Sequence, residues 1–163
     1  MGAIGDVINS LIIHQAIKEK HPDVEIHYLT LDYIAPLLEN DPHISKLWTI
    51  EDAKKKNLRY ILNVGLELRK ERYDAVISVT NSIRNKLLNL CTGSKKIAKR
   101  GKAGHKEHSV KAFYNSTKVL FDDLEIPERV KLTVSEGIKD KVYDRIKNFQ
   151  RPFIILNPGG AHD

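Results

Sequence analysis

The sequence predicts a Rossmann-like α/β domain with a parallel sheet, followed by the start of a second domain. Short apolar runs alternate with amphipathic segments of about ten or more residues, a spacing typical of parallel strands joined by crossover helices. The length of 163 residues suits about one compact domain. The apolar content of 41% is enough for a hydrophobic core.

The first elements predicted are a helix over residues 7–20, a strand over 24–28 and a short helix over 32–38. In the first helix, Ile8, Leu11, Ile12 and Ala16 recur at helical spacing and form one apolar stripe, which ends before a proline. The strand alternates apolar and polar residues. Asp32 is suited to cap the short helix.

The middle of the chain continues the alternation, with strands over 46–50 and 75–79 and helices over 58–70 and 82–91. The helix over 58–70 is expected to carry Leu58, Ile61, Leu62 and Leu66 on one face. The run 75–79 is short and mostly apolar, which is typical of a strand covered on both sides. Gly93 follows the helix over 82–91 and is suited to end it.

The last third is expected to contain a basic loop over 95–111 and a helix that starts behind Ser109 and reaches Leu124. Ser135 is expected to cap a final amphipathic helix, which is followed by a strand over 153–156. We therefore place an amino-terminal domain at 1–149 and the truncated start of a second domain at 150–163. The chain opens on a glycine-rich turn and a helix, so the first strand of the amino-terminal domain is expected to be missing.

The formal net charge of +6 is concentrated in residues 95–111, which contain seven cations and one acid, Glu107. A solvated basic loop explains this cluster, and so does a surface for a phosphate-bearing partner. Nucleic acid is the weaker choice of partner, because this stretch has no aromatic side chains on which bases could stack.

The chain has the features of a cytoplasmic protein. Its single cysteine, Cys91, cannot form an internal disulfide. No apolar run approaches the roughly 18 residues of a membrane span. The first residues lack the basic and apolar segments of a secretory signal.

Two glycines, Gly2 and Gly5, come directly before the first predicted helix and are followed by Asp6. Free N–H groups at a helix start attract anions, and glycine lets a ligand approach the backbone. Asp6 is explained as a helix cap or dipole partner. Alternatively, it is a general base at the carboxyl edge of the sheet, where ligands of α/β proteins usually bind.

Four segments in order resemble glycosyltransferase family 9, the ADP-heptose:lipopolysaccharide heptosyltransferases. They are GAIGDVINSL (2–11), RYDAVI (72–77) followed by NSIR (81–84), HSV (108–110) with LEIP (124–127), and IILNPGG (154–160). The resemblance spans nearly the whole chain.

The resemblance implies a GT-B architecture, in which two Rossmann-like domains face each other across a cleft and the amino-terminal one binds the acceptor. It implies an inverting, metal-independent transfer of heptose from an ADP-sugar to the Kdo-containing inner core of lipopolysaccharide. No metal and no cofactor are expected, since the ADP-sugar is the donor substrate. Asp6 matches the catalytic base, and Gly5 would let the acceptor sugar close on the backbone beside it.

The implied acceptor carries carboxylates and phosphates, which cations and hydrogen-bond donors would bind. The expected acceptor contacts are Gly5, Asn81, Arg84, Lys99, Arg100 and His108, and the expected contacts to the donor diphosphate are Gly159 and Gly160. Arg84 is also explained as a solvated helix cation and His108 as a helix-entry cap. A second basic cluster, Lys54–Lys56 with Arg59, is explained more simply as solvated surface.

Basic clusters of this kind could also hold the protein at the anionic inner face of the inner membrane. Because the chain stops before the segments that hold ADP in the family, we expect it to supply the acceptor half only. Two alternatives stay open. One is a GT-B transferase of other sugar specificity, and the other is a non-catalytic α/β module that binds a nucleotide or anion.

Overall fold

The computed structural model describes residues 4–80, 82–99, 109–125, 127 and 129–149. The chain forms two compact units, Met1–Thr133 and Val134–Asp163. The predicted division between residues 149 and 150 lies at the end of the described range and stays a prediction. The predicted strand over 153–156 lies outside the described residues.

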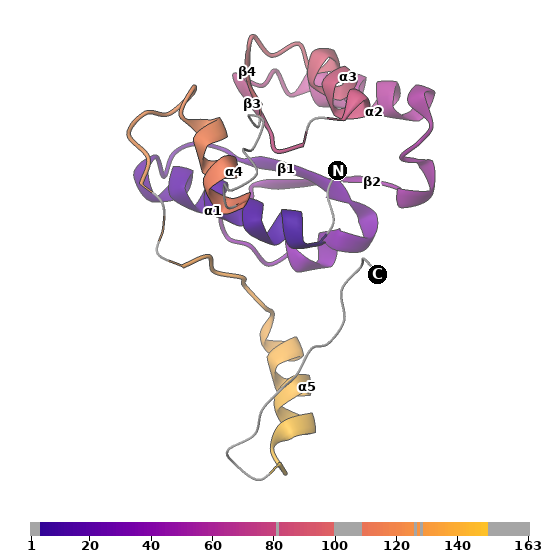
Figure 1. The fold of residues 1–163 in the computed structure, drawn as a ribbon. Helices are drawn as coiled ribbons and strands as arrows, with labels where there is room; N and C mark the ends of the chain where they lie inside the picture. Colours follow the sequence, from indigo (N-terminus) through magenta and orange to yellow (C-terminus); the bar gives the residue numbers. More distant parts are fainter. Residues whose placement is uncertain (1–3, 81, 100–108, 126, 128, 150–163) are drawn as a thin grey trace. The chain divides into compact units, whose positions relative to one another are not determined.

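The first unit alternates helices and strands (Figure 1). Its elements are α1 (Ile4–Lys20), β1 (His27–Leu31), the 3-10 helix η1 (Asp32–Leu37), β2 (Lys46–Ile50), the 3-10 helix η2 (Asp52–Lys54), α2 (Leu58–Lys70), β3 (Ala75–Ser78), α3 (Ile83–Cys91), β4 (Lys96–Lys99) and α4 (Ser109–Thr117). The second unit contains α5 (Glu136–Ile146).

The described strands form two parallel pairs. β1 pairs with β2 from His27 opposite Lys46 to Leu31 opposite Ile50. β3 pairs with β4 from Ala75 opposite Lys96 to Ser78 opposite Lys99. Parallel strands joined by helices confirm the predicted α/β class.

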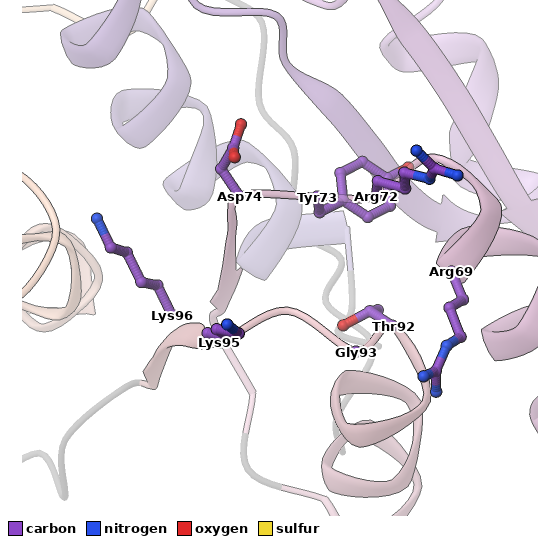
Figure 2. A pocket seen from close by; sticks show the side chains of 8 residues that line it. All are labelled: Arg69, Arg72, Tyr73, Asp74, Thr92, Gly93, Lys95 and Lys96. Atoms are coloured by element: carbon purple, nitrogen blue, oxygen red, sulfur yellow. The ribbon is translucent and has the colours of Figure 1, made fainter.

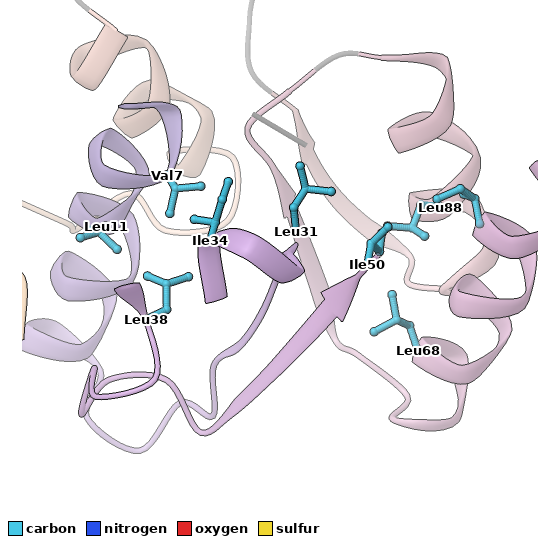
Figure 3. Packing of buried hydrophobic residues seen from close by; sticks show 9 residues of the cluster. Val7, Leu11, Leu31, Ile34, Leu38, Ile50, Leu68 and Leu88 are labelled. Atoms are coloured by element: carbon cyan, nitrogen blue, oxygen red, sulfur yellow. The ribbon is translucent and has the colours of Figure 1, made fainter. Parts of the chain in front are cut away.

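The main apolar cluster joins α1 to both strands of the first pair and to the helices α2 and α3 (Figure 3). Its buried members are Val7, Leu11, Leu31, Ile34, Leu38, Ile50, Ile61, Leu68 and Leu88. A second cluster packs the opposite side of α1 against Tyr114 of α4 and against Leu124. α1 is therefore buried on two sides and not along the single predicted stripe, and Ile8 of that stripe is exposed.

The apolar face predicted for α2 is buried only in part. Ile61 is buried as expected, but Leu58, Leu62 and Leu66 are exposed. The buried side runs instead through Ile61, Gly65 and Leu68. Gly65 is the reason, because it lets α3 approach so closely that a Cβ there would lie 2.5 Å from Cβ of Cys91.

Several other predicted elements have different bounds. The first helix begins at Ile4 and not at residue 7, so Gly5 and Asp6 lie within its first turn and do not precede it. The first strand begins at His27 and not at residue 24, since the ladder with β2 starts there. The predicted basic loop contains β4, which pairs with β3 along its whole length, while its two lysines stay exposed. α4 ends at Thr117, whose carbonyl accepts the N–H groups of residues 120 and 121, so Leu124 follows the helix.

α5 begins directly after Ser135, as predicted, although the Ser135 side chain makes no capping hydrogen bond. No residue of α5 is buried, and its apolar residues Ile138 and Val142 are exposed. Across the part of the chain that the structure describes, every helix is too short or too polar to cross a bilayer.

Candidate active site

The first turn of α1 lies at the carboxyl end of the β1–β2 pair. Val7 belongs to the same apolar cluster as Leu31 and Ile50, which are the last residues of the two strands (Figure 3). Gly5 and Asp6 immediately precede Val7 and are brought to this end with it. Ligands of α/β proteins usually bind at the carboxyl ends of parallel strands.

Asp6 is half-buried, so the residue is neither enclosed in the core nor fully solvated. Gly5 is exposed, and a Cβ built on it would meet no described atom within 4 Å. A ligand therefore has room to approach the backbone next to Asp6.

A tyrosine and a serine support α1 beneath this turn. The Ser10 hydroxyl donates to the carbonyl of Val7 at 2.8 Å and lies 2.5 Å from the Tyr28 hydroxyl. Burial raises the pKa of Tyr28, and the hydrogen bond with Ser10 opposes this shift. The negative charges of Asp41 and Asp6 raise that pKa further, so both carboxylates act on the same phenol.

A buried hydrogen bond joins His14, deeper along the same helix, to Asp41. His14 Nε2 is 2.9 Å from Oδ2 of Asp41, and the two side chains are 3% and 2% exposed. The other carboxylate oxygen accepts the backbone N–H of His43 at 2.9 Å. Burial would raise the pKa of Asp41, but the hydrogen bonds from His14 and His43 outweigh it and hold the pKa below its usual value.

This pair was not predicted from the sequence. His14 lies within the predicted first helix, and Asp41 precedes a proline that was interpreted only as a helix end. The one available signal was a histidine beside an apolar stripe, and this signal does not indicate which residue the histidine contacts.

Two of the predicted acceptor-binding cations lie at the carboxyl end of the β3–β4 pair. Lys99 is the exposed last residue of β4 and lies opposite Ser78, the last residue of β3. Arg84 is half-buried in the first turn of α3. That helix begins at Ser82, whose side chain accepts the N–H of Asn85 at 3.2 Å and so caps it.

The second basic cluster is partly neutralised. Lys54 Nζ lies 2.8 Å from a Glu51 carboxylate oxygen, and Lys55 Nζ lies 2.5 Å from one of Asp52. These short-range pairs agree with the interpretation of the cluster as solvated surface. They leave less unpaired positive charge in this cluster.

No protein-family model matches the chain. It is 30% identical over 120 residues to lipopolysaccharide heptosyltransferase 1 of Campylobacter coli, a match that covers 71% of this chain and 33% of that protein. It is 26% identical over 110 residues to lipopolysaccharide heptosyltransferase 3 of Escherichia coli K12, covering 65% of this chain and 31% of that protein. The predicted resemblance to glycosyltransferase family 9 is confirmed.

The fold agrees with this assignment. The crystal structure of a family 9 glycosyl transferase from Veillonella parvula matches with a TM-score of 0.76 at 14% identity, covering 90% of this chain and 47% of that one. The chain therefore has the fold of about half of a family 9 protein. It spans about a third of the length of the curated relatives it matches.

The family 9 resemblance singled out nine site residues, of which the structure describes four. Gly5 and Asp6 lie at the carboxyl end of one strand pair, and Arg84 and Lys99 lie at the carboxyl end of the other. The remaining residues lie outside the described part of the chain: Asn81, Arg100, His108, Gly159 and Gly160.

Proposed function

We propose that this chain is the acceptor-binding half of a heptosyltransferase that acts in lipopolysaccharide core assembly. The donor would be ADP-heptose and the acceptor the Kdo-containing inner core. The observation that carries this proposal is the half-buried Asp6 on the first turn of α1, next to open space at Gly5. The names of the curated relatives support the sugar and the acceptor class.

In this proposal Asp6 is the general base. Its carboxylate accepts the proton of an acceptor hydroxyl while that oxygen bonds to the anomeric carbon of heptose. The bond from that carbon to the diphosphate breaks, and ADP leaves with the electron pair from the opposite face. A single displacement inverts the anomeric configuration. Asp6 then returns the proton to solvent, and no metal takes part.

Cations would hold the two anionic substrates. Arg84 and Lys99 are proposed to bind carboxylates or phosphates of the acceptor, together with Asn81, Arg100 and His108. Gly159 and Gly160 are proposed to face the donor diphosphate with their N–H groups. The acceptor would bring the protein to the inner face of the inner membrane, on the cytoplasmic side.

Product analysis tests this function. The complete protein that carries this chain is incubated with ADP-heptose and a Kdo-lipid acceptor, and the lipid is examined by mass spectrometry and NMR. We expect the acceptor to gain one heptose with inverted anomeric configuration. Release of free heptose without transfer, or transfer from another nucleotide sugar in preference to ADP-heptose, would contradict the proposal.

A further inference from the structure

A hollow of about 440 Å³ lies at the amino ends of β3 and β4 (Figure 2). Its lining includes four cations, Arg69, Arg72, Lys95 and Lys96. They come from the last turn of α2, the segment before β3 and the start of β4. In Figure 2 the two arginines lie on one side of the hollow and the two lysines on the other.

These four cations have no carboxylate partner among the described residues. Other lysines of the same unit are ion-paired: Lys46 with Glu71 at 2.6 Å and Lys70 with Glu67 at 2.7 Å. The lining of the hollow contains one acidic residue, Asp74, against the four cations. Positive charge is therefore in excess there, and unpaired cations around a concave surface attract anions.

Two residues that line the hollow, Arg72 and Gly93, have positive φ angles. Arg72 has a φ of 54°, in the left-handed region that residues other than glycine rarely adopt. Gly93 has a φ of 72°, and a Cβ there would lie 3.4 Å from Cζ of Arg69. The Arg69 guanidinium thus packs against the bare backbone of Gly93. A strained residue such as Arg72 is typical of functional sites.

We propose that this hollow binds a phosphate group. Arginine presents planar pairs of N–H donors that match phosphate oxygens, and lysine adds charge from the other side. The phosphate belongs to a soluble phosphorylated compound or to a lipid headgroup, which offer the same chemistry. This site lies where the β3–β4 ladder starts, whereas Lys99 lies where it ends. It is separate from the proposed transfer site and does not depend on the proposed function.

Removal of one arginine and one lysine tests the site. Arg72→Gln with Lys95→Gln is compared with Lys55→Gln and Lys70→Gln, a control that removes two ion-paired cations from the same unit. Titration of the full chain with inorganic phosphate is followed by NMR. We expect about tenfold weaker binding in the first variant and unchanged binding in the control. Equal affinities in the two variants, or no saturable binding by the unmodified chain, would overturn the proposal.

Arg72→Gly separates binding from folding. Glycine adopts a positive φ without strain, so this change should raise the melting temperature. It also removes a guanidinium, so phosphate binding should weaken several-fold. A stabilised protein with undiminished phosphate binding would show that Arg72 is only a turn residue and would overturn its role in the site.

Vesicles distinguish the two phosphate sources. Sedimentation with vesicles of equal parts phosphatidylglycerol and phosphatidylcholine is measured for the unmodified chain and both double variants. Binding that is lost in the Arg72→Gln, Lys95→Gln variant and kept in the control supports a lipid headgroup. Phosphate binding without vesicle binding supports a soluble compound. Vesicle binding that both variants retain equally would show that the hollow does not bind the lipid headgroup.

Discussion

Asp6 and Asp41 are two carboxylates near the same helix whose surroundings differ. Asp41 is enclosed, and its oxygens accept hydrogen bonds from His14 and from the N–H of His43. Asp6 is only half-buried and lies next to the open space at Gly5. A carboxylate that is satisfied by buried donors stabilises the fold, whereas one with access to a ligand can exchange a proton with it.

Asp41→Ala should lower the free energy of unfolding by about 3 kcal/mol, because it leaves His14 buried without its partner. Chemical denaturation followed by circular dichroism measures this change. Asp123→Ala is the control, since it removes the partner of His21 from a half-exposed pair. An equally small effect of both substitutions would show that the His14–Asp41 pair does not stabilise the fold.

The stabilising effect of Asp41 should depend on pH. Its pKa is lowered in the folded protein, so the unfolded state binds the proton more readily in acid. The unmodified protein should have a higher free energy of unfolding than Asp41→Asn. This difference should be largest above about pH 4 and should shrink as the pH falls through the lowered pKa. Denaturation at a series of pH values measures it. A difference that stays constant into strong acid would contradict the pKa shift.

At the scale of elements, the close approach of α2 and α3 depends on one glycine. Gly65→Ala should lower the free energy of unfolding by about 1–3 kcal/mol, because the new Cβ would overlap Cys91 and force the helices apart. Gly137→Ala on α5 is the matched control. No described atom lies within 4 Å of its Cβ position, so it should be neutral or stabilising by up to about 1 kcal/mol. Loss of stability in the control alone would contradict this account.

The order and type of most described elements could be predicted because hydrophobic periodicity reports local structure. The buried face of α2 could not, because an exposed stripe of Leu58, Leu62 and Leu66 has the same spacing as a buried one. Strand β4 was missed because its pairing with β3 is a tertiary contact, and its terminal lysines resemble a loop in composition. The sequence does not indicate which element packs against which face of a helix or strand.

In the candidate site, too, the local features could be predicted and the tertiary contacts could not. Asp6 was predicted from a local pattern of glycines at a helix start, and the structure places it at the carboxyl end of β1 and β2. The contact between Ser10 and Tyr28 joins residues 18 positions apart and was not predicted. The four cations of the hollow are unpaired because, among the described residues, the fold places no carboxylate partner beside them. Composition alone does not reveal this.

For the whole molecule, the concentration of cations in residues 95–111 predicts an electrostatic effect on acceptor binding. Replacing Lys99, Arg100 and Lys102 by Gln should raise the acceptor KM and reduce its dependence on salt, since fewer charges remain to be screened. Steady-state kinetics of the complete protein at several ionic strengths measures both. Replacing Lys54, Lys55 and Lys56 removes the same charge and should change KM less. Equal effects would assign the attraction to net charge alone.

The most direct test of the proposed mechanism is the effect of Asp6→Asn on turnover in the complete protein. The amide keeps the shape of the side chain but cannot accept the acceptor proton, so kcat should fall by about 10²–10⁴-fold. The affinity for ADP-heptose, measured by calorimetry, should be unchanged. Asp23→Asn, on the exposed turn after α1, is the control and should retain full activity. Turnover retained by Asp6→Asn would contradict the role of Asp6 as the base.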